Sequence, residues 1–229
     1  AARERNIIVT NTPDVLNDDV ADLAVALMLS VARAIPQGDR YVRDGRWETD
    51  GMMALQTQFS GKTVGILGLG RIGKVIARRC EAFDCTILYH GRSQQEGVPY
   101  RYYADLETMA RDCDFLCAIC PGGEATRNIV NRPVLEALGP KGFLVNVARG
   151  SVVDMDSLIA VLREGKLGGA ALDVFPEEPK VERALLEFPN VIVQPHVASA
   201  TIETRTAMGD LTIENLALHF AGQPVRTPV

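Results

Sequence analysis

The pattern of apolar and polar positions changes character at Thr63. Before it, residues 18–35 are apolar on almost every side, which predicts a long helix buried on two faces, within a subunit or between subunits. Asn17 is placed to cap that helix, and a short strand is expected at residues 7–11. The polar, glycine-punctuated stretch around Trp47 predicts an arm or loop. The helix carries two apolar stripes, formed by Ala21, Val25, Met28, Val31 and Ile35 and by Leu23 and Leu27.

From Thr63 onward, short apolar runs alternate with segments of helical periodicity, and a closing amphipathic helix is expected at residues 202–220. Such alternation is typical of an α/β fold, a Rossmann-like doubly wound parallel sheet flanked by helices. The expected strands are 63–68, 86–90, 114–120, 143–148, 169–174 and 191–195, and the expected helices between them are 71–83, 105–112, 133–138 and 156–164.

Composition narrows the functional classes. The 229 residues are 47% hydrophobic and 23% charged, with a net charge of −5, so we expect neither a nucleic-acid partner nor an anionic membrane surface. No apolar run reaches the ~18 residues that span a bilayer. The opening AARERN has no apolar region behind it, so no secretory signal is expected.

Cysteine usage points to a reducing compartment. An odd count of five scattered cysteines is typical of reduced thiols, and we expect a cytoplasmic protein. Cys117 and Cys120 form a C-x-x-C, but they lie in an apolar, strand-like run without a second Cys or His pair nearby. We therefore interpret them as structural residues and predict no metal site.

A glycine fingerprint follows the first strand of the alternating region. Gly68, Gly70 and Gly73 fit G-x-G-x-x-G after a strand and at the start of a helix, which is the context of dinucleotide binding. Gly68 allows the tight turn, Gly70 the approach of a pyrophosphate, and Gly73 close packing of helix and strand. The free N–H groups expected to meet the pyrophosphate at this helix N-terminus belong to Leu69, Gly70, Arg71 and Ile72.

The end of the second expected strand identifies the dinucleotide. About 20 residues beyond the fingerprint, an Asp or Glu normally accepts hydrogen bonds from the ribose of NAD. Here stand His90, Gly91, Arg92 and Ser93 instead. Arg92 offers a fixed cation with a fork of donors for a 2′-phosphate, so NADP(H) is predicted as the preferred cofactor and NAD(H) as the secondary one. The alternative is that Arg92 is a solvated surface charge.

Three ionisable residues follow expected strands in the second half of the sheet: Arg149, Glu178 and His196. Because parallel sheets bind ligands at the carboxyl ends of their strands, we expect these side chains to converge on one crevice. Reduction of a keto acid by hydride transfer needs a cation for the carboxylate, a proton donor for the new alkoxide, and a partner that keeps the donor charged. Arg, His and Glu can fill these roles.

Several longer motifs carry a specific resemblance. VTNTPDVLNDDVADLAVALML, GKTVGILGLGRIG, NVARGSVVD, GGAALDVFPEEP and PHVASAT resemble the D-isomer-specific 2-hydroxyacid dehydrogenase family over essentially the whole chain. Within it, the chain is most similar to the NADPH-using glyoxylate, hydroxypyruvate and hydroxyphenylpyruvate reductases. The implied activity is hydride transfer from NADPH to C2 of a small 2-keto acid, giving the D-2-hydroxy acid.

The resemblance implies a role for each matching residue. Arg149 would bind the substrate carboxylate and keto oxygen, His196 would be the general acid, and Glu178 rather than Glu177 would keep the imidazole charged near neutral pH. Asp173 would meet the nicotinamide carboxamide. The sequence departs from the family at Gly122 and Gly123, which would loosen the cofactor loop. Further cofactor contacts are implied at Cys120, Pro121, Thr126, Val147, Ala148, Arg149, His196, Ala198 and Ser199.

The resemblance also implies a domain organisation. Residues 1–16 would be the end of an N-terminal flavodoxin-like substrate domain, 17–197 the dinucleotide-binding domain, and 198–229 a C-terminal helix and tail that return towards the substrate domain. With so little of the substrate domain, the chain is expected to be a fragment that binds NADPH but catalyses weakly. We further expect a homodimer formed through helix 18–35, whose stripes exceed what one sheet face covers, and the arm around Trp47.

Alternatives differ in class. One is a non-enzymatic, NAD(P)H-gated binding protein, because corepressors of the same fold keep the three catalytic residues. The formate dehydrogenase branch lacks the acid at Glu178, and a phosphoglycerate dehydrogenase would bring an acid at residues 90–92. The sequence leaves open which small 2-keto or 2-hydroxy acid is the substrate.

Overall fold

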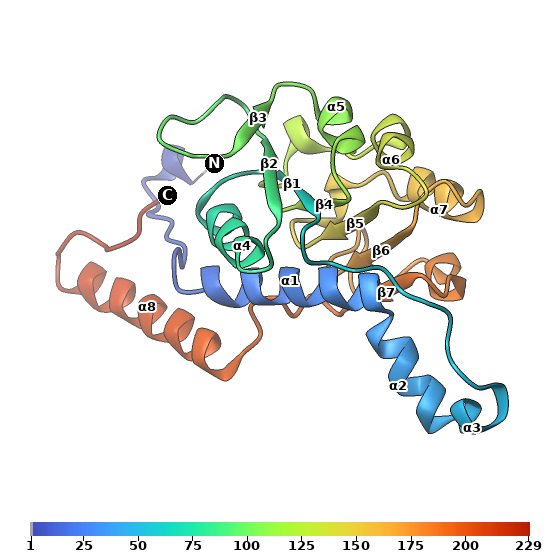
Figure 1. The fold of residues 1–229 in the computed structure, drawn as a ribbon. Coiled ribbons are helices and arrows are strands. Elements are labelled where there is room, and N and C mark those ends of the chain that lie inside the picture. Colours follow the sequence, from blue (N-terminus) through green and yellow to red (C-terminus); the bar gives the residue numbers. More distant parts are fainter. Residues whose placement is uncertain (1) are drawn as a thin grey trace.

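A single parallel sheet of seven strands forms the centre of the computed structural model, which describes residues 2–229 (Figure 1). The strand order is β3-β2-β1-β4-β5-β6-β7, so the chain reverses direction across the sheet between β1 and β4. The predicted doubly wound sheet is therefore confirmed. The strands are β1 (Thr63–Leu67), β2 (Thr86–His90), β3 (Arg101–Tyr103), β4 (Phe115–Ala118), β5 (Phe143–Asn146), β6 (Gly169–Leu172) and β7 (Val191–Val193).

The central strands owe their continuous apolar sequences to burial on both faces. Every residue of β4, β5 and β6 is buried. Helices cover each side of a parallel sheet, so neither face reaches water. The sequence prediction omitted β3, a three-residue edge strand that pairs with β2 at Leu88, Tyr89 and His90. Its three residues run from exposed Arg101 to buried Tyr103 and are too few to give a periodic signal.

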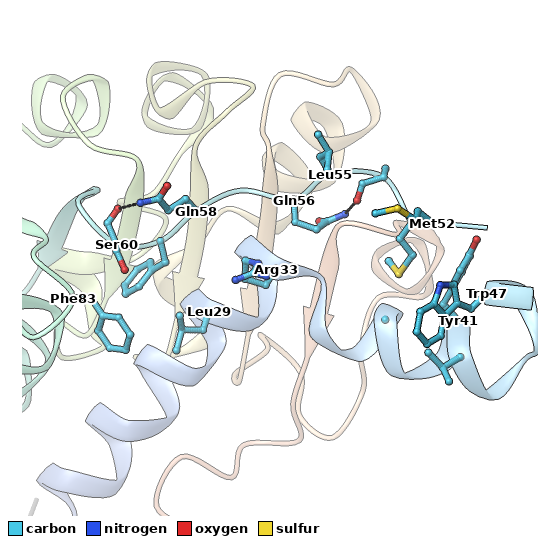
Figure 2. Close-up of a pocket in the computed structure, with 15 residues that line it drawn as sticks. Leu29, Arg33, Tyr41, Trp47, Met52, Leu55, Gln56, Gln58, Ser60 and Phe83 are labelled. Carbon is cyan, nitrogen blue, oxygen red and sulfur yellow. Dashed lines mark hydrogen bonds between the residues drawn. The ribbon is translucent and has the colours of Figure 1, made fainter. Parts of the chain in front are cut away.

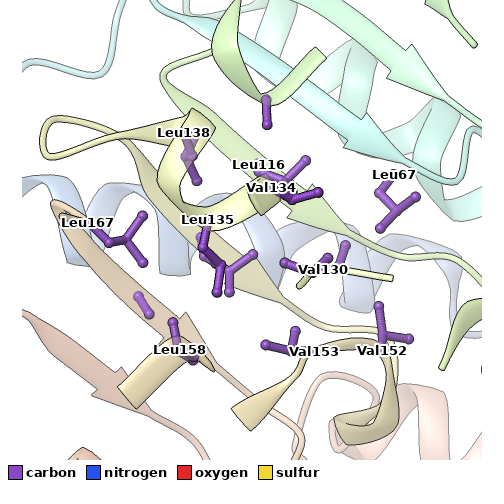
Figure 3. Packing of buried hydrophobic residues seen from close by; sticks show 14 of the residues in the cluster. Leu67, Leu116, Val130, Val134, Leu135, Leu138, Val152, Val153, Leu158 and Leu167 are labelled. Atoms are coloured by element: carbon purple, nitrogen blue, oxygen red, sulfur yellow. The ribbon is translucent and has the colours of Figure 1, made fainter. Parts of the chain in front are cut away.

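Two layers of helices enclose the sheet (Figure 1). On one face α1 and α4 pack against the sheet and each other, and on the other lie α5, α6 and α7, whose apolar side chains interdigitate with those of β4 and β6 (Figure 3). The helices are α1 (Asn17–Arg33), α2 (Ile35–Arg43), α3 (Arg46–Asp50), α4 (Arg71–Glu81), α5 (Leu106–Arg111), α6 (Arg132–Leu138), α7 (Met155–Arg163) and α8 (Ile202–Phe220). Short 3₁₀ turns are η1 (Arg3–Arg5), η2 (Glu124–Thr126), η3 (Gly150–Val152) and η4 (Arg183–Glu187).

The long N-terminal helix is buried on two sides within one chain. Leu27 and Met28 are 2% and 0% exposed because the sheet and α4 cover both stripes. Most of both stripes is thus covered within one chain, although Ile35 is 53% exposed, and a subunit contact through this helix stays a prediction. The expected cap was wrong: Leu16 precedes the helix, and the Asn17 amide donates to the Asp14 carboxylate instead.

The segment after α1 is helical, where the sequence had predicted an arm or loop. Helix α1 ends when Ala34 adopts a left-handed conformation, and α2 begins at the next residue. Pro36 fits there because the first helical turn needs no N–H from it. Ion pairs one turn apart, Arg43–Asp39 and Arg46–Asp50, support α2 and α3. The two helices project from the body as an arm, residues 35–50 (Figure 1).

The N-terminal segment and the C-terminal tail lie together. The expected strand at residues 7–11 is reduced to one antiparallel bridge, between Thr10 and Pro228, flanked by a hydrogen bond from the Asn11 N–H to the Thr227 carbonyl. Helix α8 has the predicted bounds but not the predicted amphipathic character. Its buried positions include Thr204 and Asn215, and the Asn215 side chain accepts hydrogen bonds from the tail backbone.

Two further properties concern the described part of the chain. Among residues 2–229, no helix combines the length and apolar character required to cross a bilayer, and no group of three or more His, Cys, Asp or Glu side chains is arranged to hold a metal ion.

All five cysteines are free and buried. Burial raises the pKa of the Cys80 and Cys113 thiols to about 12, and that of Cys120 to about 11.

Candidate active site

A crevice runs along the carboxyl ends of the strands, on both sides of the point where the strand order reverses. It consists of a cavity of about 970 Å³ above β4, β5 and β6 and an adjoining one of about 440 Å³ at the start of α4. Ile72, Pro121 and Arg149 line both cavities and so connect them. Ligands of open α/β sheets bind at this position.

The glycine loop has the geometry expected for a pyrophosphate. Gly68 lies at φ +105°, and a Cβ there would come within 2.7 Å of the Cys120 Cα. A Cβ on Gly73 would lie 2.3 Å from the Gly68 carbonyl oxygen, which explains the close approach of α4 to the loop. At Gly70, by contrast, the corresponding space is open. The backbone N–H groups at the start of α4 can therefore be approached by an anion.

Arg149 is the first residue beyond the β5 turn, and a buried amide fixes its backbone. The Asn146 side chain is fully buried, accepts a hydrogen bond from the Ala148 N–H at 3.0 Å and donates one to the Arg149 carbonyl at 3.1 Å. The guanidinium of Arg149 is exposed in the crevice and donates to the Ala148 carbonyl. Gly122 leaves room for this side chain, because a Cβ there would lie 2.8 Å from the Arg149 Cγ.

His196 is held in an unusual backbone conformation by Asp173. Its φ is +53°, a value that residues other than glycine rarely adopt. The Asp173 carbonyl accepts from the His196 N–H, and its carboxylate accepts from the N–H groups of Val197 and Ala198 at 2.8 and 3.0 Å. Burial raises the pKa of Asp173, although the two N–H donors and the nearby His196 oppose that shift.

Glu178, in the loop after β6, contacts His196, in the loop after β7. Its Oε2 lies 2.7 Å from Nδ1 of His196, and its Oε1 accepts from the Phe175 N–H at 3.0 Å. Burial opposes ionisation of this carboxyl. However, the hydrogen bonds from His196 and Phe175 and the charges of His196 and Arg149 outweigh burial, and the pKa of Glu178 is lowered. The neighbouring Glu177 forms a backbone bridge with Lys180 instead.

The structure brings together most of the residues that the sequence singled out, but not all of them. The larger cavity is lined by Ile72, Cys120, Pro121, Val147, Ala148, Arg149, Asp173, Glu178, His196, Ala198 and Ser199, and the smaller by Gly68, Gly70, Arg71 and Gly73. Leu69 and Arg71 were predicted to offer backbone N–H groups, and this stays a prediction; the Leu69 side chain is buried in the core, and that of Arg71 pairs with Asp14 at 3.0 Å. Thr126 lines neither cavity and donates to the Pro121 carbonyl within its own loop.

Arg92 and Ser93 lie outside both cavities, on the exposed loop after β2. Within residues 2–229, Arg92 has neither an ion-pair nor a hydrogen-bond partner, so its guanidinium is available to an external anion. The loop itself is attached to the glycine loop, since the Gln95 side chain donates to the Leu69 carbonyl at 2.7 Å.

Sequence reasoning missed Asn146, the residue that fixes the turn carrying Arg149. The signal was present in the sequence FLVNVA, where one amide interrupts an otherwise apolar run that predicts a buried strand. A buried polar side chain needs partners, and the nearest unpaired backbone groups are those of the turn that follows. Gly150 was also missed. A Cβ there would lie 2.0 Å from the Phe175 carbonyl carbon, so the loops after β5 and β6 touch at this glycine.

The crevice fits a nicotinamide dinucleotide. The open glycine loop at the start of α4 offers backbone donors to a pyrophosphate, and the larger cavity extends from Pro121 to the Ala198 backbone. Arg149 and His196 border the same cavity, so a small acid and the reactive end of a cofactor have room to meet there.

Comparison with known proteins agrees with this arrangement. Residues 25–198 match the family of the D-isomer specific 2-hydroxyacid dehydrogenase, NAD binding domain. The chain therefore belongs to the D-isomer specific 2-hydroxyacid dehydrogenase family, whose members are oxidoreductases.

Individual relatives refine the likeness. The chain is 52% identical over 227 residues to glyoxylate/hydroxypyruvate reductase A of Arabidopsis thaliana, covering 99% of this chain and 72% of that protein. It is also 52% identical to hydroxyphenylpyruvate reductase of Plectranthus scutellarioides, with the same coverage. The fold superposes with a TM-score of 0.96 on an NADPH-dependent glyoxylate/hydroxypyruvate reductase of Sinorhizobium meliloti in complex with NADP and malonate, at 50% identity, covering 100% of this chain and 72% of that one.

Proposed function

We propose that the protein reduces a small 2-keto acid of the glyoxylate and hydroxypyruvate class with NADPH, giving the D-2-hydroxy acid. The observation that carries this proposal is the convergence of Arg149, Glu178 and His196 on the crevice that begins at the glycine loop. Relatives named as reductases of such acids support the substrate class.

Arg149 binds the substrate in this proposal. Its guanidinium carries a permanent positive charge and is exposed in the crevice, so it can pair with a carboxylate and donate to the adjacent keto oxygen. The hydrogen bonds from Asn146 hold the turn below it, which fixes the position from which the side chain extends. The substrate is thereby oriented with its keto carbon towards the interior of the larger cavity.

His196 and Glu178 supply the proton. When bound, the nicotinamide provides the hydride for C2 of the keto acid, and negative charge develops on the substrate oxygen. Glu178 is hydrogen-bonded to Nδ1 of His196, which stabilises the charged ring, and Nε2 has no hydrogen-bond partner in residues 2–229. Nε2–H can therefore donate its proton to the oxygen, after which the neutral imidazole is reprotonated from solvent.

We place the adenosine end of the cofactor between the glycine loop and Arg92. An exposed guanidinium without a partner, beside the hydroxyl of Ser93, favours a ribose 2′-phosphate, whereas no carboxylate at residues 90–93 is present to bind a ribose hydroxyl. NADP(H) is therefore the proposed cofactor, with NAD(H) bound more weakly. The NADP complex of the Sinorhizobium meliloti relative supports this choice.

A cofactor and substrate panel tests the proposal. Glyoxylate, hydroxypyruvate, hydroxyphenylpyruvate and 2-ketogluconate are each offered with NADPH and with NADH, and oxidation of the cofactor is followed by absorbance. We expect NADPH-linked reduction of the small acids, and the same assay on a longer chain decides whether the 229-residue chain is the weak catalyst expected from its sequence. Tight NADPH binding without turnover by either chain would instead support a cofactor-gated binding protein.

We also propose the domain division at residues 16/17 and 197/198. Residues 2–16 and 198–229 contact each other through Thr10 and Pro228 and lie beside the sheet rather than within its layers (Figure 1). The catalytic His196 would then stand next to a domain junction. Limited proteolysis with and without NADPH checks the division, since cleavage within residues 17–197 as the first event would contradict it.

The arm supports a proposal about assembly. Apolar side chains from the arm, from α1 and from the segment before β1 line an open groove of about 950 Å³ (Figure 2). Trp47, Met52 and Leu55 are 61%, 84% and 93% exposed. We propose that a second copy of the chain covers this surface in a homodimer, which places the interface at the arm and at the end of α1 that carries Leu29 and Arg33. Sedimentation should give a dimer, and Leu55→Asp should weaken it; a wild-type monomer at micromolar concentration would contradict the proposal.

The compartment follows from the thiols. Five free, buried cysteines without disulfides are typical of a reducing environment, and a cytoplasmic location is therefore proposed. Imaging of a tagged full-length protein tests it.

A further inference from the structure

The loop after β2 is exposed, yet its two ends are attached to a buried tyrosine, Tyr89, and a partly buried one, Tyr102. The Tyr102 hydroxyl donates to the Gly91 carbonyl at 3.3 Å, and the Tyr89 hydroxyl accepts from the Gln95 N–H at 2.8 Å. Tyr89 is fully buried, and its ring packs against that of Tyr102 with centroids 5.3 Å apart. Residues 92–94 are therefore a short exposed span between two fixed points.

A third hydrogen bond joins this span to the glycine loop. The Gln95 side-chain amide donates to the Leu69 carbonyl at 2.7 Å, and Gln95 is only partly exposed. Leu69 lies between the first two glycines of the fingerprint, at the end of β1, whereas Gln95 follows β2. The loops at the two cofactor-facing strand ends thus have a direct side-chain connection in addition to the sheet.

The residues between these anchors have the opposite character. Arg92 and Ser93 are exposed, and within residues 2–229 neither side chain is held by a hydrogen bond or an ion pair. When a charged side chain is disordered before it binds an anion, the conformational entropy lost on ordering that side chain lowers the affinity for the anion. Here the side chains remain free, but the backbone that carries them is fixed relative to the glycine loop.

We propose that Gln95 is a positioning residue for cofactor selectivity, which holds Arg92 and Ser93 at a set place relative to the pyrophosphate-binding loop. This inference rests on the proposed use of NADPH. In this proposal NADPH bridges the two loops, because its pyrophosphate binds at the glycine loop and its 2′-phosphate at Arg92, so its binding depends on the separation of the loops. NADH lacks that phosphate and gains nothing from the position of Arg92.

The first experiment measures cofactor dissociation constants for Gln95→Ala and Gln95→Met by fluorescence titration. Methionine keeps most of the side-chain volume but cannot donate to the Leu69 carbonyl, so it separates the hydrogen bond from packing. Loss of one such bond should weaken NADPH binding about 3- to 10-fold in both variants. NADH binding should change less than about 2-fold on the same scale. Gln94→Ala is the matched control, because Gln94 is exposed and has no hydrogen bond in the described residues.

The second experiment repeats Gln95→Met in an Arg92→Ala background. If Gln95 acts through Arg92, its effect on NADPH should disappear there. An equal loss for both cofactors, an undiminished loss in the Arg92→Ala background, or no loss at all would overturn the inference. If Arg92→Ala alone leaves the preference for NADPH unchanged, the cofactor assignment fails, and that result is distinct from a failure of Gln95.

Discussion

At the carboxyl ends of β5, β6 and β7, the side chains proposed for chemistry are exposed, while buried polar groups fix the backbone that carries them. Asn146 holds the turn of Arg149, and Asp173 holds the segment of His196. At the end of β2, the exposed Arg92 is carried by a loop whose two ends are held by the buried Tyr89 and by the partly buried Tyr102 and Gln95. The residues proposed for chemistry are thus fixed by buried polar groups beside them, whereas Arg92 is fixed only through the ends of its loop.

This difference has a physical reason. Buried, fully bonded polar groups are costly to disturb, so they hold a geometry that has to be maintained to within about 1 Å for catalysis. Substitutions in an exposed loop, by contrast, have little effect on the packing of the core. The comparison therefore predicts large, cofactor-independent effects at the substrate end and smaller, cofactor-selective effects at the adenosine end.

The largest effect is expected for His196→Ala. Loss of the proton donor should lower kcat about 10²- to 10⁴-fold, while NADPH affinity stays nearly unchanged. Steady-state kinetics and fluorescence titration measure the two quantities. His219→Ala, on α8, is the matched control and should leave kcat unaltered. A fall in kcat of less than about 10-fold for His196→Ala would remove it from the proton-transfer role.

At the opposite end, Arg92→Ala should weaken NADPH binding about 10- to 150-fold, the loss expected for one charge-assisted contact. NADH binding should barely change, because it has no 2′-phosphate. Arg101→Ala removes the same charge from the neighbouring strand β3, where Arg101 stacks on Tyr103, and serves as the control. Equal losses for NADPH and NADH would mean that Arg92 is a general surface charge.

The buried support beneath Arg149 can be tested by Asn146→Ala. This change leaves the Ala148 N–H and the Arg149 carbonyl without their partner, so the free energy of unfolding should fall by about 1–3 kcal/mol. The KM for the keto acid should rise about 10-fold as the guanidinium loses its position. Urea titration and kinetics measure both. Asn190→Ala breaks a hydrogen bond to Gly168 near the amino end of β7 and should lower stability without changing KM.

The smallest effect is a displacement of the pH profile in Glu178→Gln. The hydrogen bond from His196 is one cause of the lowered pKa of Glu178, so the pair is strongest while Glu178 is ionised. Glutamine cannot ionise, so the fall of kcat/KM that accompanies protonation of Glu178 on the acid side should be absent in the variant. On the acid side, the stability that ionised Glu178 contributes is lost as pH falls through its lowered pKa. Glu177→Gln is the control, and an unchanged kcat/KM profile for Glu178→Gln would argue against the pairing.

Elements with strong apolar periodicity could be predicted well from the sequence. Elements whose structure depends on contacts with other parts of the chain could not. Strands β4 to β6 and helix α7 could be located from their patterns alone, and the glycine loop from its spacing. The three-residue β3, the break at Ala34 and the helical arm could not, because left-handed residues and surface ion pairs leave no periodic signal. The roles of Asn146 and Gln95 depend on partners in other loops, which a single sequence does not reveal.

The position of α1 has a consequence for how the chain acquires its structure during synthesis. This helix precedes every strand, yet it packs against β5, β6 and β7. At about 5–20 residues per second, roughly 10–30 s separate its emergence from that of Val191–Val193. Helix α4 can cover one side of α1 soon after it is made, but the side that faces β5, β6 and β7 has no partner until late in that interval, which favours chaperone binding or misassembly on the ribosome. Among the described elements, α1 is therefore made early and completely packed only late.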